Sequence, residues 1–225
     1  AGANADVPGF EDEYVSGRRP TGIYVPNFQF EPSRYKKHYK RGYSFGGAAW
    51  RETWDSRAWQ DGFGADFKNS IRTVGPWKFN LYAQGEMLPN FDNQVSLHPS
   101  KKDKWGIPQL HINCRWSDNE HAMMEDAAET GANMLRKAGF ENVTSDWRKG
   151  PPGLGIHETG TARMGRDPKE SVLNGFNQCH DIPNLFVTDG SSYCSVATQN
   201  PSLTFMAMTV RAVDFAVREM KEKRI

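Results

Sequence analysis

Hydrophobic and polar residues alternate in several segments of the first 150 residues, a pattern typical of strands with one buried face. The clearest cases are residues 77–83, 94–98 and 109–114. A charged turn, Pro99–Gly106, joins the last two, and such links are too short for crossover helices, so we predict an antiparallel meander. Segment 22–30 predicts a further strand, which Pro26 weakens or places at a sheet edge. Residues 1–50 are otherwise irregular in pattern, and Gly46-Gly47 indicates a tight turn or close packing.

Two helices are predicted from apolar stripes and from their end signals. The first begins after Ser117, which forms a capping box with Glu120, and ends at Gly139. Its apolar stripe consists of Met123, Ala127, Gly131, Met134 and Ala138. The second begins at Asn200, an N-cap residue, with Pro201 in the first helical position. Its apolar positions are Phe205, Met208, Ala212, Phe215 and Ala216.

Composition excludes some classes of function. Lysine and arginine number 28 against 27 aspartate and glutamate residues, so no basic excess favours a nucleic-acid partner. No apolar run approaches the roughly 20 residues that a transmembrane helix needs. The three cysteines lack a C-x-x-C spacing, and His121 with Glu125 reads as a surface pair. We therefore predict no metal site.

The residues best suited to chemistry lie between His157 and Thr204. His157 opens the glycine-rich sequence HETGTARMG, and the apolar run 184–188 predicts a strand that ends in Asp189 and Gly190. The predicted helix start at Asn200 follows. Strand ends and helix N-termini both favour polar ligand groups, so the three segments could meet around one ligand.

The order of these motifs resembles the C-terminal segment of the glucose–methanol–choline (GMC) flavoprotein oxidoreductases. The sequences HETGTARMG, NQCHDIPNLFVTDG and QNPSLT are most similar to the bacterial glucoside 3-dehydrogenase branch of sugar dehydrogenases. The sequence of residues 85–95 also resembles that branch. Three motifs in a fixed order are more specific than any one of them.

The resemblance implies an α+β fold in two parts. Residues 1–150 would form part of a substrate-binding domain, an antiparallel sheet with helices. Residues 151–225 would supply the C-terminal strand and helix of a Rossmann-like domain that binds flavin adenine dinucleotide (FAD). The G-x-G-x-x-G turn that cradles the pyrophosphate is missing, because its nearest match, 153–158, has Glu158 in place of the third glycine. We therefore expect a C-terminal fragment without the N-terminal part of the FAD domain, inactive when isolated.

The resemblance also implies catalytic roles for His157 and Asn200. His157 would be the base that takes the proton from a substrate hydroxyl, a task that suits imidazole near neutral pH. Asn200 cannot titrate, so it would orient that hydroxyl through a hydrogen bond. Structural readings stay open: a histidine bonded within a turn, and an asparagine that caps a helix.

Cofactor contacts are implied for the strand end and the helix start. Asp189 and Gly190 would lie at the ribityl and pyrophosphate region, where the carboxylate accepts from ribityl hydroxyls or backbone amides. Asp189 could instead cap a turn. The helix start, comprising Asn200, Pro201, Ser202 and Thr204, would face the flavin edge that gains negative charge on reduction.

These roles predict FAD-dependent oxidation of a secondary alcohol of a sugar or glycoside to a ketone, with hydride transfer to flavin N5. Position C3 of the pyranose follows from the resemblance alone. The alternatives are another pyranose, aldonate or alcohol dehydrogenase or oxidase of the superfamily, and a non-catalytic carbohydrate-binding module that suits the seven tryptophans. A serine hydrolase lacks its G-x-S-x-G elbow here. The resemblance further implies a cytochrome or quinone as electron acceptor, a small partner subunit and a periplasmic location, while the residues leave a cytoplasmic location open.

Overall fold

The computed structural model describes residues 1–10, 22–29, 38–147, 150–153 and 155–225. The chain divides into two compact units, Ala1–Gly85 with Asp118–Lys149 and Glu86–Ser117 with Gly150–Ile225. Residues 86–117 group with the second unit, and the predicted division of the chain into 1–150 and 151–225 stays a prediction. The assignment of the two parts to substrate and cofactor stays a prediction.

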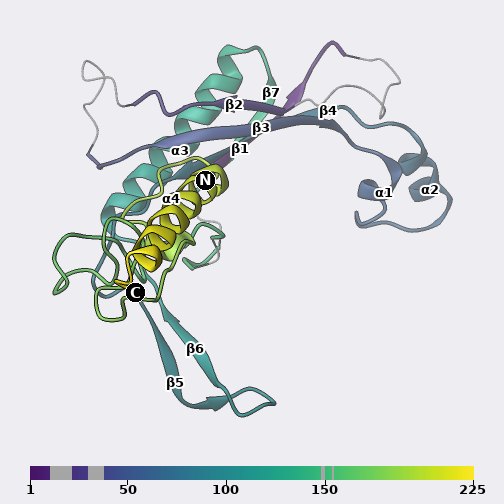
Figure 1. Cartoon of the computed structure of the whole chain (residues 1–225). Coiled ribbons are helices and arrows are strands. Elements are labelled where there is room, and N and C mark those ends of the chain that lie inside the picture. The colour runs from purple at the N-terminus through teal and green to yellow at the C-terminus, as the bar shows by residue number, and fades with distance from the viewer. Residues whose placement is uncertain (11–21, 30–37, 148–149, 154) are drawn as a thin grey trace. The chain divides into compact units, whose positions relative to one another are not determined.

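The first unit is a five-stranded antiparallel sheet with a long helix along one face (Figure 1). Its strand order is β2-β3-β4-β1-β7. The strands are β1 Gly2–Val7, β2 Gly22–Val25, β3 Tyr43–Arg51, β4 Trp77–Gly85 and β7 Glu141–Asp146. Two short helices, α1 Trp54–Arg57 and α2 Gly64–Arg72, lie between β3 and β4 in sequence. The predicted α+β class and the predicted strands at β2 and β4 are confirmed, although Phe30, at the end of predicted segment 22–30, lies outside the described residues.

Strands β1 and β3 contradict the prediction that residues 1–50 are mostly irregular. Gly46 and Gly47 lie inside β3, where close packing and not a turn requires them. A Cβ atom on Gly46 would come within 2.3 Å of the Tyr82 ring, and one on Gly47 within 2.4 Å of the Asn80 carbonyl oxygen. Small residues at 46–49 of β3 and at 2–3 and 5 of β1 interrupt the hydrophobic alternation, so the pattern does not reveal these strands.

Helix α3, Asp118–Lys137, begins and ends where its capping signals predict. Gly139 has a φ of 83°, and the Phe140 N–H donates to the Leu135 carbonyl, which is the bond expected of a Schellman cap. The buried face of α3 packs on the sheet. The core of this unit comprises Ala3, Ala5, Tyr39, Tyr43, Phe45, Leu81, Met123, Ala127, Ala132 and Leu135.

A buried polar cluster fastens α3 to β3 and to the segment before it. The hydroxyls of Tyr39 and Tyr43 each donate to one carboxylate oxygen of Asp126, at 2.6 Å. The Gln29 amide donates to the same oxygen at 3.3 Å. Burial, and then the bond to Asp126, raise the pKa of both tyrosines well above the ordinary value.

We expect the first unit to lose stability in strongly alkaline solution because of these tyrosines. Since their pKa is raised in the folded state, their contribution is complete below the unfolded value of about 10 and is lost as pH rises past it. The free energy of unfolding should therefore fall more steeply above pH 10 in the unchanged protein than in Tyr43→Phe. Urea titrations at a series of pH values measure both slopes, and equal slopes would contradict the assignment.

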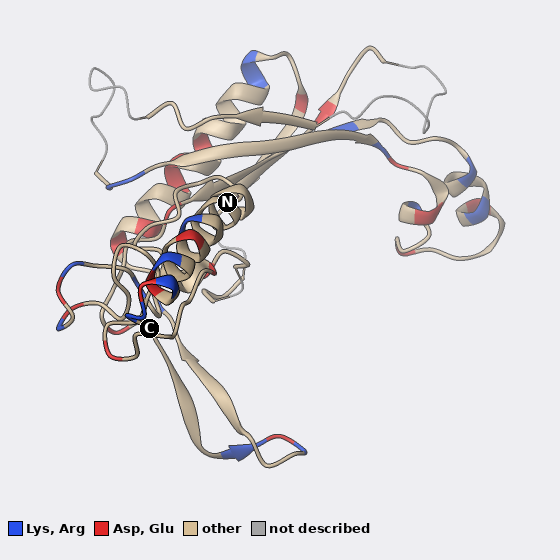
Figure 2. Cartoon of the chain, in the orientation of Figure 1, with Lys and Arg blue, Asp and Glu red and all other residues tan. Residues whose placement is uncertain are grey.

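The second unit contains a hairpin, a long helix and extended loops. Strands β5 Gln94–Lys102 and β6 Pro108–Asn113 form the predicted hairpin, with charged residues gathered at its tip (Figure 2). The predicted meander of β4 with β5 and β6 is wrong. Both edges of β4 are already paired, with β1 and β3, so β5 and β6 form a separate two-stranded sheet.

Helix α4, Ser202–Lys221, forms in the region where the sequence predicts the second helix. An apolar row stays exposed on it: Leu203, Met206, Val210, Val213, Val217 and Met220. The strand predicted at 184–188 is not formed, and only an isolated bridge joins Phe186 to Gln178. Its flanking hydrogen bonds run from the Cys179 N–H to the Leu185 carbonyl and from the Val187 N–H to the Asn177 carbonyl, a pairing shorter than an ordinary strand. Among the described residues no helix has the length and apolar character needed to cross a bilayer.

Candidate functional site

The glycine-rich loop that begins at His157 lies alongside a single turn of 3-10 helix, η1, Gly190–Ser192. The Ala162 N–H donates to the Ser191 carbonyl at 3.0 Å, and the Met164 N–H donates to the Ser192 carbonyl at 2.9 Å. Two of the three predicted site segments are therefore in direct contact.

Asp189 caps this turn. Its carboxylate accepts from the Ser191 N–H at 2.9 Å and from the Ser191 hydroxyl, while its carbonyl accepts from the Ser192 hydroxyl at 2.8 Å. Within this unit Asp189 therefore makes the contacts expected of a residue that caps a turn. The side chain is also exposed, so a carboxylate oxygen remains accessible to a ligand hydroxyl.

Gly190 lets three segments approach one another. A Cβ atom there would lie 2.9 Å from the Glu158 carbonyl oxygen and 3.3 Å from the Phe205 ring. Glu158 belongs to the His157 loop and Phe205 to the first turns of α4. Any other residue at position 190 would separate the loop, the turn and the helix.

The start of α4 has no side-chain cap. The Phe205 N–H donates to the Pro201 carbonyl at 3.0 Å, which makes Pro201 the N-cap residue and Ser202 the first helical residue. The prediction of Asn200 as N-cap is wrong by one position, within the usual uncertainty of helix ends. The N–H groups of Ser202, Leu203 and Thr204 precede the first intrahelical bond, so this end attracts negative charge.

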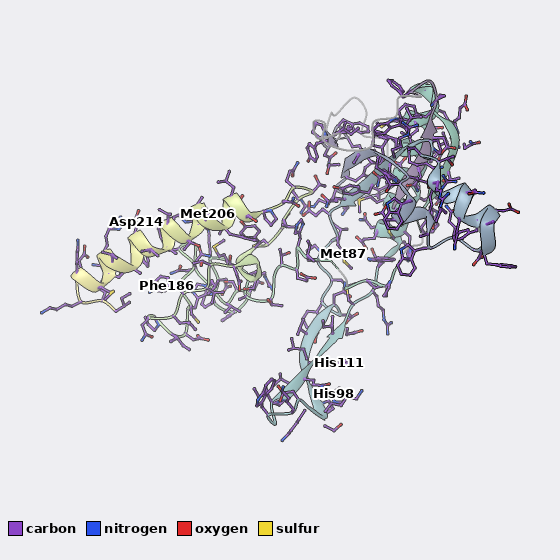
Figure 3. All side chains as sticks on the ribbon, turned by 90° about the vertical axis from the view of Figure 1, so that its right-hand side faces the viewer. Met87, His98, His111, Phe186, Met206 and Asp214 are labelled. Atoms are coloured by element: carbon purple, nitrogen blue, oxygen red, sulfur yellow. The ribbon has the colours of Figure 1, made fainter. Side chains whose placement is uncertain are left out.

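Aromatic contacts hold α4 against the rest of the site. Phe205 packs on Tyr193 with ring centroids 5.0 Å apart. Farther along the helix, Phe215 stacks on Phe176 at 4.4 Å and contacts Phe186 at 6.3 Å; Figure 3 shows Phe186 beside α4. The segment that leads into Asp189 is thereby fixed to the same helix that follows Asn200.

His157 and Asn200 lie on these converging segments. His157 is partly buried and Asn200 is exposed. Neither side chain hydrogen-bonds within the part of the chain that the structure describes. Both are thus available to a ligand, and the prediction that they converge on one substrate oxygen stays a prediction. The same described part contains no group of three or more His, Cys, Asp or Glu residues that could hold a metal ion.

Sequence reasoning missed two buried polar residues that support the site. Asn177, fully buried, donates to the Val187 carbonyl at 2.9 Å and accepts from Arg211 of α4 at 3.4 Å. Glu86, also buried, accepts a hydrogen bond from the Ser195 hydroxyl. Both lie in polar, turn-like stretches, where a single amide or carboxylate gives no sign of burial.

Comparisons with a family model and with individual proteins point to the same family. A family model described as GMC oxidoreductase matches residues 89–209. The 2-methyl-1,2-propanediol dehydrogenase of Mycolicibacterium austroafricanum is 36% identical over 142 residues, which is 63% of this chain and 26% of that protein. The fructose dehydrogenase large subunit of Gluconobacter japonicus is 27% identical over 71% of this chain and 29% of its own length.

A third relative is the C-glycoside 3-oxidase of Arthrobacter globiformis, 30% identical over 57% of this chain and 25% of its own length. The chain therefore spans about a quarter of the length of these curated relatives. Their names share the oxidation of an alcohol or a sugar.

Proposed function

Since the chain belongs to the GMC oxidoreductase family, we propose that the complete protein is an FAD-dependent enzyme that oxidises a secondary alcohol of a sugar or glycoside to a ketone. Two of the relatives are named for fructose and for a C-glycoside, which supports this substrate class. Oxidation at C3 is the form of the proposal that agrees with the C-glycoside 3-oxidase.

One observation carries the proposal: the loop of His157, the Asp189–Gly190 turn and the uncapped start of α4 converge in one unit. His157 and Asn200 each keep their hydrogen-bonding capacity for a ligand. These groups fit one edge of a flavin and an alcohol beside it, because the free N–H groups of α4 suit a carbonyl or an anionic ring. Asp189 and Gly190 would hold the ribityl side.

The residues of this chain handle the proton and the orientation of the substrate. When bound, FAD supplies the acceptor of the hydride that leaves the alcohol carbon. His157 accepts the hydroxyl proton at an imidazole nitrogen, so the alcohol loses one hydride and one proton in total. Asn200 donates from its amide to the same oxygen and keeps the carbon–hydrogen bond in a reactive orientation.

The same proposal includes the acceptor that takes the electrons from the reduced flavin. A cytochrome or a quinone would reoxidise the flavin, with the help of a small partner subunit and in the periplasm. The fructose dehydrogenase relative is named as a large subunit, which supports the idea of a partner. A second candidate substrate class is small alcohols, favoured by the identity of 36% to the propanediol dehydrogenase.

The test is anaerobic titration of the complete, flavin-loaded protein with a panel of glucosides, free sugars and small diols. The proposal expects the visible flavin absorbance to bleach with a sugar or glycoside and a keto sugar to form. Bleaching with diols alone would select the second candidate. A colourless protein that binds sugar would instead indicate the non-catalytic carbohydrate-binding module.

A further inference from the structure

Glu86 is a carboxylate that the proposed chemistry does not use, although it is only 6% exposed. Its Oε1 atom accepts a hydrogen bond from the hydroxyl of Ser195. A buried carboxyl group requires hydrogen-bond partners to offset its desolvation. The bond therefore fixes Ser195 to the beginning of the second unit.

Ser195 lies in the loop that leads to Asn200. At the front of this loop, the Cys194 thiol donates to the Met164 carbonyl at 3.1 Å, next to the His157 loop. At its far end, Pro201 is buried where α4 begins. Asn200 is exposed between these fixed points, so its position depends on the path of the loop.

The loop holds an unfavourable backbone conformation. Ala197 has a φ of 60°, in the left-handed region that residues with a Cβ atom rarely adopt. Such a conformation persists only where the surroundings enforce it. The Glu86–Ser195 bond lies two positions before Ala197, and the buried residue Thr198 follows directly after it.

We propose that Glu86 is a positioning residue for Asn200 and acts through the Ser195 hydroxyl, an inference that rests on the proposed function. Glu86 itself touches neither substrate nor cofactor in this role. It keeps the loop 194–200 in one path, and the Asn200 carboxamide thereby stays where it can orient the substrate hydroxyl. Misplacement of an orienting group by about 1 Å can cost on the order of 100-fold in rate.

The first arm of the test measures flavin reduction in the complete, flavin-loaded enzyme. Glu86→Ala and Ser195→Ala should each slow reduction by about 10-fold to 100-fold, and the double variant should be no slower than Glu86→Ala alone. Glu86→Gln, which keeps a carbonyl acceptor for Ser195, should recover most of the rate. Added to Asn200→Ala, the Glu86→Ala change should cause no further slowing. Full additivity with Asn200→Ala, or an unchanged rate in Ser195→Ala, would overturn the inference.

The second arm is independent of activity. Hydrogen–deuterium exchange of the same enzyme should become faster at the amides of 196–200 in Glu86→Ala and Ser195→Ala, but not in α3. Ser70→Ala is the matched control, because its exposed hydroxyl donates to the Phe67 carbonyl within α2 of the first unit. Unchanged exchange at the amides of 196–200 would show that the Glu86–Ser195 hydrogen bond does not restrain the loop. A wild-type flavin that no sugar or alcohol reduces would reject the proposed function, and the inference with it, whatever the exchange pattern.

Discussion

Replacement of His157 by alanine in the complete enzyme should slow flavin reduction by about 10²-fold to 10⁴-fold while the bound flavin keeps its visible spectrum. The side chain has no partner among the described residues, so its removal leaves no buried group unpaired in this unit. What is lost is the acceptor for the hydroxyl proton, without which a hydride can leave only from a neutral alcohol. Anaerobic stopped-flow reduction by the preferred sugar measures the effect directly.

His121→Ala is the control for this experiment. His121 is exposed on α3 of the first unit, where its ring contacts Trp147 with centroids 6.0 Å apart. We expect its removal to leave the reduction rate within twofold of wild type, a change of less than about 0.5 kcal/mol in the barrier. Reduction of the His157→Ala enzyme near the wild-type rate would show that another group takes the proton.

The elements that sequence alone predicts well are those with both a period and end signals. Helix α3 has an apolar stripe, a serine before its first turn and a glycine after its last. Strands β5 and β6 alternate and are joined by a short charged turn. Interactions between residues that are close in sequence determine these elements, so the sequence pattern predicts them.

The elements that the pattern misses depend on partners far away in sequence. Strand β3 contains Gly46 and Gly47 because the Tyr82 ring and the Asn80 carbonyl of β4 lie directly against them. Nothing near position 46 encodes that contact. Conversely, the run 184–188 looks like a strand, yet among the described residues its backbone pairs with the short segment around Gln178 and with no full strand. Pairing partners, and not propensity, decide both cases.

In the site, too, some features are predictable from local sequence and others depend on residues far away in the chain. Motif order predicts that His157, Asp189 and the helix start share one region, and in the structure Gly190 lies against the Glu158 carbonyl of the His157 loop and the Phe205 ring of α4. The supporting residues could not be found this way. Glu86 is buried and accepts a hydrogen bond from Ser195, more than a hundred positions away along the chain. A carboxylate in the polar sequence GEMLPN is otherwise indistinguishable from a solvated one.

Replacement of Phe45 by alanine should destabilise the first unit by about 3–5 kcal/mol, a large fraction of the total stability of a typical domain. Phe45 is 0% exposed; its ring packs edge-on against Tyr43 at 5.2 Å and lies against Gly131 of α3. The cavity left behind opens between the sheet and helix α3, where rigid strand backbones limit collapse. Urea denaturation measures the loss. Phe63→Ala provides the control, since Phe63 is 94% exposed and should change the free energy of unfolding by less than about 0.5 kcal/mol. Equal losses in the two variants would mean that the β3–α3 contact is not the core of this unit.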